Sequence, residues 1–93
     1  MKVYPTIHNR SDPYGLPAYE VSGTQLYPTI HNERDAFGLP SFEIRNGQLY
    51  PCVTNSRYTF GLPVYDIRGS QLFPTIHNQS QGYGLPIFDL RPF

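Results

Sequence analysis

The amino-acid sequence predicts an all-β protein built from β-hairpins, and three observations support this fold class. A stretch of 23 residues occurs four times in tandem, in copies that span residues 2–24, 25–47, 48–70 and 71–93. Ten prolines and eight glycines disfavour long helices. Each copy also contains short runs in which apolar and polar residues alternate. Because one copy is too short to bury a core alone, we expect the copies to pack together as one repeat domain, residues 1–93.

Each copy begins with a run that we expect to form its first strand. In the second copy this run is 25–32, which contains Leu, Tyr, Pro, Thr and Ile in order and ends in Asn. A loop of variable sequence follows and ends in an aromatic residue and Gly-Leu-Pro. The second strand then alternates in character, as in Phe42-Glu43-Ile44-Arg45. We expect structural roles for Gly-Leu-Pro and for the four asparagines, which favour turns: Asn9, Asn32, Asn55 and Asn78.

The joints between successive copies have the sequences of two-residue hairpin turns. Asn46-Gly47 is typical of a type I′ turn, and Gly23-Thr24 and Gly69-Ser70 are typical of type II′ turns. The second strand of one copy should therefore pair with the first strand of the next copy. The predicted register at the second joint places four pairs opposite each other: Arg45 and Gln48, Ile44 and Leu49, Glu43 and Tyr50, Phe42 and Pro51.

A proline in each first strand limits any further pairing. Pro51 falls at a non-hydrogen-bonded position of its hairpin, where the missing N–H costs nothing, and Pro28 and Pro74 are equivalent to it. The same proline removes a donor from the outer edge of the strand. We therefore predict four separate hairpins rather than one uniform eight-stranded barrel.

The two ends of the chain complete the fourth hairpin. Three joints make three hairpins and leave 3–7 and 87–90 without partners, and these two runs fit each other in the same register. We expect a closed, pseudo-fourfold arrangement in which the termini pair, because closure removes open strand edges. Pairing between chains and an open hairpin solenoid are the alternatives. The period and the glycine and aromatic usage resemble MORN repeats, a resemblance that implies hairpins and assigns no site residue.

The register sorts the side chains of each hairpin onto two faces. One face is apolar, and we expect it to form the core: Pro40, Phe42, Ile44, Leu49, Pro51 and Val53. The other face is mixed and should carry any function: Leu39, Ser41, Glu43, Arg45, Gln48, Tyr50, Cys52 and Thr54. Two further aromatic sets mix Tyr and Phe, so we expect the rings to lie in the core and the hydroxyls to have no role: Tyr14, Phe37, Phe60 and Tyr83, then Tyr19, Phe42, Tyr65 and Phe88.

Recurring aromatic and polar residues on the mixed face suggest a ligand site. Exposed rings beside acids and imidazoles suit sugars, because rings stack on the apolar faces of sugars and polar groups bind the hydroxyls. The candidate ligand-binding residues are Tyr4, Tyr27, Tyr50, Glu20, Glu43, Asp66, Asp89, His8, His31 and His77, with Phe73 in place of the fourth tyrosine. We expect a non-catalytic, multivalent, lectin-like module for carbohydrate or another small polar ligand. The alternative is a structural or self-assembling protein, a homo-oligomer whose loops contact partner chains.

Two of these sets have competing interpretations. The acids precede Arg45, Arg68 and Arg91 by two residues, so an ion-pair ladder on the surface is the simpler explanation for them. The three histidines could converge on a metal in a closed ring, but Thr54 takes their position in the third copy. We therefore expect no structural metal and no other cofactor.

Composition excludes several functional classes. The formal net charge is zero and no basic stripe occurs, so we expect no nucleic-acid partner. No apolar run approaches a membrane span and no signal peptide follows Met1, so we expect a soluble chain without a membrane partner, whose location remains open. The single cysteine, Cys52, excludes an internal disulfide. No nucleophile elbow, phosphate loop or zincin motif is present, so we expect no enzymatic activity.

Overall fold

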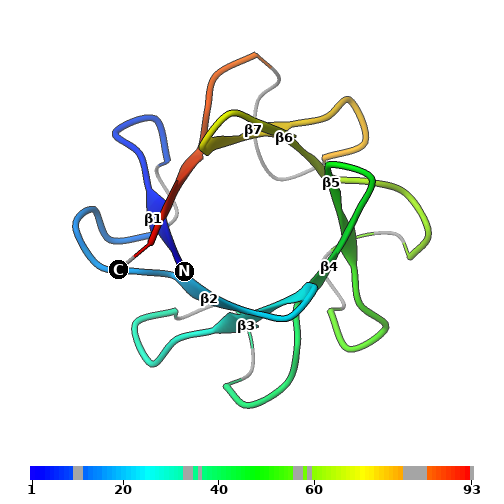
Figure 1. Cartoon of the computed structure of the whole chain (residues 1–93), viewed down its shortest axis with the longest axis horizontal. Helices are drawn as coiled ribbons and strands as arrows, with labels where there is room; N and C mark the ends of the chain where they lie inside the picture. The colour runs from blue at the N-terminus through cyan, green and yellow to red at the C-terminus, as the bar shows by residue number, and fades with distance from the viewer. Residues whose placement is uncertain are drawn as a thin grey trace.

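In the computed structural model the chain forms a closed β-barrel of antiparallel strands. The structure describes residues 1–9, 12–32, 35, 37–55, 58, 60–78 and 84–92. Within these ranges the barrel contains eight strands, and each pairs with its neighbours in chain order. Figure 1 shows the strands as a ring from which the connecting loops project outward. The strands are β1 Lys2–Pro5, β2 Tyr19–Ser22, β3 Gln25–Pro28, β4 Phe42–Arg45, β5 Gln48–Pro51, β6 Tyr65–Arg68, β7 Gln71–Pro74 and β8 Phe88–Arg91.

The predicted hairpins and their turns are confirmed. β4 and β5 pair with Glu43 opposite Tyr50 and Phe42 opposite Pro51, and β2–β3 and β6–β7 repeat this four-pair register. Asn46 and Gly47 both have positive φ, 51° and 74°, as a type I′ turn requires. In the other two turns only the first central residue has positive φ, as in type II′. The turn sequence therefore sets the register of each hairpin.

The ends of the chain pair as predicted and close the barrel. β1 and β8 are antiparallel, with Val3 opposite Leu90, Tyr4 opposite Asp89 and Pro5 opposite Phe88. The N- and C-termini lie side by side in Figure 1. The terminal strands thus form a hairpin that has the register of the other three but no turn to connect it.

The prediction of four separate hairpins is wrong, because the two strands of a single copy also pair. In the first copy Lys2 lies opposite Glu20 and Val3 opposite Tyr19, and β3–β4, β5–β6 and β7–β8 are paired in the same way. Only two residue pairs form at each of these contacts, against four in each hairpin. The paired residues precede the proline, so the missing donor shortens this ladder without breaking it.

Four aromatic rings fill the centre of the barrel. They follow each other edge to face, with centroids 5.5–5.8 Å apart, and are almost fully buried. Such edge-to-face contacts stabilise a core beyond the area that they bury. The rings are Tyr19, Phe42, Tyr65 and Phe88. Buried aliphatic residues of the first strands pack around them: Val3, Leu26, Leu49 and Leu72.

Two of the central rings carry hydroxyls that do have a role, contrary to the prediction. The Tyr19 hydroxyl donates to a carboxylate oxygen of Asp35 at 2.5 Å. The Tyr65 hydroxyl is hydrogen-bonded to Tyr58 and Asn78. Burial raises the pKa of Tyr65 well above its ordinary value, and the neighbouring tyrosines Tyr58 and Tyr19 raise it further. The hydroxyls therefore tie the core to the loops.

The predicted division of side chains between the core face and the mixed face is correct within the strands and wrong at their ends. Val53 is 82% exposed although alternation placed it in the core, because β5 ends at Pro51 and the backbone turns, with the Asn55 N–H donating to the Cys52 carbonyl. Ser41 is buried although alternation placed it on the mixed face. The aromatics before Gly-Leu-Pro are exposed rather than buried, at 65–69%: Tyr14, Phe37 and Phe60. Tyr83 lies outside the described residues.

The four asparagines have the predicted structural role. The amide of Asn32 donates to the Ala18 carbonyl at 3.0 Å, so that it links the second copy to the first. Asn55 and Asn78 make the equivalent bond, and Asn9 donates to Ile87 at 3.4 Å across the junction of the termini. All four asparagines are buried. These bonds hold the turn that follows each first strand against the preceding copy.

Candidate ligand-binding pockets

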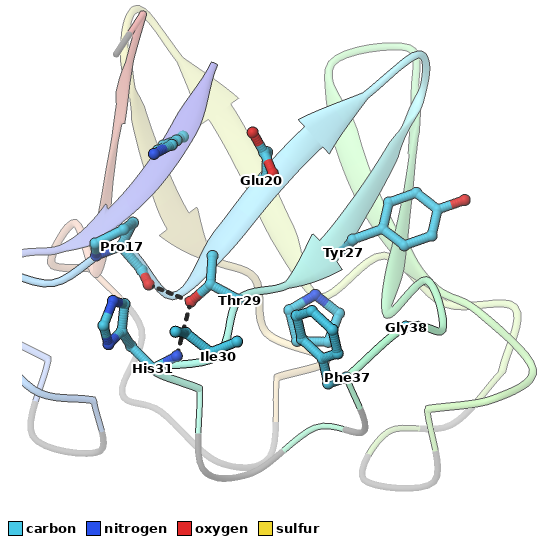
Figure 2. A pocket seen from close by; sticks show the side chains of 10 residues that line it. Pro17, Glu20, Tyr27, Thr29, Ile30, His31, Phe37 and Gly38 are labelled. Carbon is cyan, nitrogen blue, oxygen red and sulfur yellow. Dashed lines mark hydrogen bonds between the residues drawn. The ribbon is translucent and has the colours of Figure 1, made fainter.

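Three described pockets lie between neighbouring copies, each at the end of a first strand. The largest of the three described here, between the first two copies, has a volume of about 430 Å³ and is lined by Glu20, Tyr27, His31 and Phe37 among others. Figure 2 shows these side chains around the end of β3. A second pocket of about 280 Å³ contains Asp66 and His77, and a third of about 220 Å³ contains Asp89 and His8.

The three pockets are built from the same positions of the repeat. One copy contributes its acid, the proline of Gly-Leu-Pro and the first residue of its first strand, and the next copy contributes Thr-Ile-His. The first residue is lysine in one pocket and glutamine in the other two: Lys2, Gln48 and Gln71. The structure thus brings each histidine beside the acid of the preceding copy, a pairing that is absent from the sequence analysis.

A turn built on threonine positions each histidine. The Thr29 hydroxyl donates to the Pro17 carbonyl at 2.5 Å, and the His31 N–H donates to the Thr29 hydroxyl oxygen at 3.2 Å (Figure 2). Thr6 and Thr75 make the equivalent two bonds: their hydroxyls donate to the Pro86 and Pro63 carbonyls, and they accept from the His8 and His77 N–H groups. The backbone of the turn is closed by Asn32, whose N–H donates to the Thr29 carbonyl. The imidazole is therefore placed on the pocket wall by bonds that do not use its ring.

The third copy makes the same contact with a different residue. Cys52 replaces the threonine, and the hydroxyl of Thr54, two residues later, donates to the Pro40 carbonyl at 2.7 Å. The two substitutions therefore compensate each other in the fold, but the imidazole is lost. Burial and then Glu43 raise the pKa of the Cys52 thiol, and Arg45 opposes them in part, so the thiol stays protonated at neutral pH.

Three of the four acids, Glu43, Asp66 and Asp89, are bound by neighbouring side chains. The Gln48 amide donates to Asp66 at 2.8 Å, and Gln71 donates to Asp89 at 3.1 Å. The predicted ion-pair ladder is present, with N–O distances of 3.6–3.9 Å: Arg45 with Glu43, Arg68 with Asp66 and Arg91 with Asp89. Such exposed pairs add little stability. The ladder therefore orients the arginine side chains and contributes little to the stability of the fold.

The predicted tyrosines divide into two groups. Tyr27 lines the largest pocket together with Glu20 and His31. Tyr4 and Tyr50 do not line the three pockets described here, and an arginine guanidinium lies over each ring at 4.5 and 4.2 Å. Phe73 is covered in the same way, and Glu43 also lies outside these three pockets.

The rings that stand open beside the pockets are ones that the sequence analysis placed in the core. Phe37 and Tyr14 line two of the pockets and are 69% and 66% exposed. The sequence signal that these rings lie outside the core was their position directly before a glycine. Gly15 and Gly38 have φ of 92° and 96°, in the left-handed region, which shows that the chain turns there instead of entering a strand.

The histidines lie in three different pockets rather than together on the axis, which the core rings fill. Within the described ranges, no group of three His, Cys, Asp or Glu side chains could hold a metal ion. The same part of the chain contains no helix that is long and apolar enough to cross a membrane. Comparison with protein families, curated proteins and solved structures finds no significant match to this chain.

Proposed function

We propose that the protein is a non-catalytic, multivalent binding module whose repeated pockets bind carbohydrate or another small polar ligand. The observation that supports this proposal is recurrence. An acid, a proline and a glutamine or lysine from one copy meet threonine, isoleucine and histidine of the next in three separate pockets. A structural requirement alone would not place an imidazole at each, since Thr54 satisfies the fold without one.

The side chains of the largest pocket match the two chemical faces of a sugar. The exposed Phe37 ring and Ile30 offer apolar surface for the C–H face of a pyranose. Glu20 and His31 offer an acceptor and an imidazole for hydroxyl groups. A volume of about 430 Å³ falls within the range of small-ligand pockets.

Repetition would give such a module avidity. Each pocket is open and would bind a single sugar weakly, but four copies in a pseudo-fourfold arrangement present their pockets on one rigid barrel. A branched or polymeric glycan that reaches two pockets would bind far more tightly than a monosaccharide. Several similar sites are a property of binding modules rather than of enzymes, and we propose no catalytic residue.

The third copy provides the test. We expect a glycan-array screen to identify a ligand, and calorimetry with its monovalent form to give a stoichiometry near three, because the third copy has Thr54 in place of histidine. The double variant Cys52→Thr/Thr54→His restores both residues of the other copies and should raise the stoichiometry to four. Cys52→Thr alone is the control and should leave it at three.

Two results would overturn the proposal. One is a broad screen that finds no glycan. The other is a ligand whose stoichiometry and affinity are both unchanged by His31→Ala and by Phe37→Ala, because these variants remove an imidazole and a ring from the largest pocket without touching the core, and one site should then weaken or be lost.

A second candidate function is assembly with partner chains through the loops. Each copy exposes an aliphatic side chain in the turn after its first strand, at 75–82%: Ile7, Ile30, Val53 and Ile76. Apolar groups repeated in this way around one barrel suit contacts with other chains, a second copy of this one included. Sedimentation at micromolar concentration tests this function. Oligomers that the fourfold Ile/Val→Ser variant dissociates, together with a negative glycan screen, would favour it over ligand binding.

A further inference from the structure

Three of the four hairpins hold one of their own arginines in the same place. In β4–β5 the Arg45 guanidinium lies 4.2 Å from the centroid of the Tyr50 ring, and its Nε lies 3.6 Å from the Glu43 carboxylate. Glu43 and Tyr50 are directly opposite each other in the register. The ring and the carboxylate together therefore form a site for a guanidinium, which we call the arginine slot.

The slot recurs in two more hairpins. Arg68 lies 4.3 Å from the Phe73 centroid and 3.9 Å from Asp66 in β6–β7. Across the junction of the termini, Arg91 lies over Tyr4 and 3.6 Å from Asp89. Because phenylalanine serves as well as tyrosine, the face of the ring and not the hydroxyl binds the cation.

The β2–β3 hairpin has the slot without the arginine. Glu20 lies opposite Tyr27, as Glu43 lies opposite Tyr50. The Tyr27 hydroxyl donates to Gln25 at 3.1 Å, as Tyr50 donates to Gln48 at 3.4 Å, so the two rings have the same orientation. Serine takes the arginine position at residue 22.

Nothing in the described part of the chain fills this slot. No cation lies over Tyr27 there, and Glu20 has no ion pair or side-chain hydrogen bond. In Figure 2 the Tyr27 ring points to the side of β3 away from Glu20, and none of the other side chains drawn lies over it. Glu20 and Ser22 are both exposed, so the slot is open to solvent.

We propose that this slot binds an arginine side chain of a partner protein or peptide. The other three hairpins define the occupant, since in each the same ring and carboxylate hold a guanidinium. A guanidinium over an aromatic face and beside a carboxylate is stabilised by both groups, but each contact is weak when exposed. A single arginine therefore binds weakly, and neighbouring residues of the partner supply the remaining affinity. The slot shares Glu20 and Tyr27 with the largest pocket, so an arginine bound there would compete with a carbohydrate ligand. The slot is inferred from the other three hairpins and does not depend on the carbohydrate proposal.

Lys2 sets the charge beside the slot. It lies opposite Glu20 on β1. A glutamine faces the acid in the other three copies, and in two of them it donates a hydrogen bond to that acid. A lysine there offsets part of the Glu20 charge and repels an incoming guanidinium. Lys2→Gln is therefore expected to strengthen binding about threefold, and Glu20→Gln to weaken it by a similar factor.

The test is an NMR titration of the whole protein with N-acetyl-arginine amide. We expect chemical-shift changes centred on Glu20 and Tyr27, and changes at least fivefold smaller with N-acetyl-citrulline amide, which has nearly the same shape and no charge. Ser22→Arg supplies the missing side chain and should abolish the changes. Equal responses to the two amides, a wild-type response in Ser22→Arg, or no response of Tyr27 to arginine amide would overturn the proposal.

Removing an arginine from one of the other hairpins should create a second binding site for arginine amide. Arg45→Ser empties the slot at Tyr50 and Glu43, and the titration should then show a second set of changes on β4 and β5. Arg68→Ser does the same on β6 and β7, so that one misfolded variant does not decide the outcome. If both variants fold and neither responds to arginine amide, the ring and carboxylate do not suffice as a site, and the proposal fails.

Discussion

The hydroxyl of Thr54 bonds to the carbonyl of Pro40 at 2.7 Å and so makes the contact that a threonine two positions earlier makes in the other copies. The bond joins the third copy to the second, and its equivalents join the three remaining pairs of neighbouring copies. The position of the donor has moved while the contact has been kept. The contact between copies, rather than the identity of either residue, is therefore what the fold requires.

Removal of this hydroxyl should destabilise the barrel unless the threonine is restored. Thr54→Val leaves the Pro40 carbonyl without its side-chain donor, and we expect the free energy of unfolding to fall by about 1 kcal/mol. Cys52→Thr in the Thr54→Val background should recover most of the loss. Chemical denaturation of the two single variants and the double variant measures both effects, and additive effects would contradict the exchange of donors.

Truncation of a central ring should be far more damaging. Phe42 is buried and contacts Tyr19, Tyr58 and Tyr65. We expect Phe42→Ala to cost about 3–5 kcal/mol, which is a large part of the stability of a small domain. Phe37→Ala is the matched control, since that ring is exposed, and it should change the thermal midpoint only slightly. Similar losses in the two variants would contradict this description of the core.

Stability should fall at alkaline pH because of Tyr65. Burial raises its folded-state pKa above the ordinary value of 10.0, so the unfolded chain releases this proton at a lower pH than the folded barrel does. The contribution is fully present below pH 10 and is lost as the pH rises from there through the folded pKa. Denaturation between pH 8 and pH 11.5 should show this slope, and it should be smaller in Tyr65→Phe. An identical slope in the variant would assign the effect to other groups.

The chain should tolerate new termini at a hairpin turn. A permutant that joins Arg91 to Lys2 through Asn-Gly and opens the chain between Asn46 and Gly47 exchanges one unconnected hairpin for another, because β1–β8 and β4–β5 have the same register. We expect it to fold with a thermal midpoint close to that of the parent. A cut between Glu43 and Ile44 would divide β4 and should prevent folding, as circular dichroism would show.

Local sequence rules were sufficient for the hairpins and insufficient for the sites. The register follows from turns such as Asn46-Gly47, whose geometry depends on two adjacent residues. Terminal pairing followed because the two unpaired runs matched each other. The extent of pairing inside a copy could not be derived, since it depends on how closely strands approach on closing the barrel. Pro51 indicated where that ladder ends but not that the ladder exists.

The exposed rings and the pockets depend on where strands stop. Val53 continues the alternation of β5 but lies past the residue at which the backbone turns. Phe37 resembles the core rings in composition and differs only in its place before a glycine. The meeting of His31 with Glu20 involves two copies, and neither residue indicates the other in the sequence. The empty arginine slot became visible only after the structure had shown where Arg45 lies.

The unconnected pairing of β1 with β8 has a consequence for the order of folding. Three hairpins close through two-residue turns, so each needs only neighbouring residues and forms within microseconds. The fourth hairpin must bring Thr6 to Pro86, across 80 positions of the chain. Closing this long loop has a large entropic cost, which is reduced once the other three hairpins have formed and packed, so we expect β1 and β8 to pair last. On the ribosome, the first strand must therefore wait unpaired on one side until the last strand has emerged.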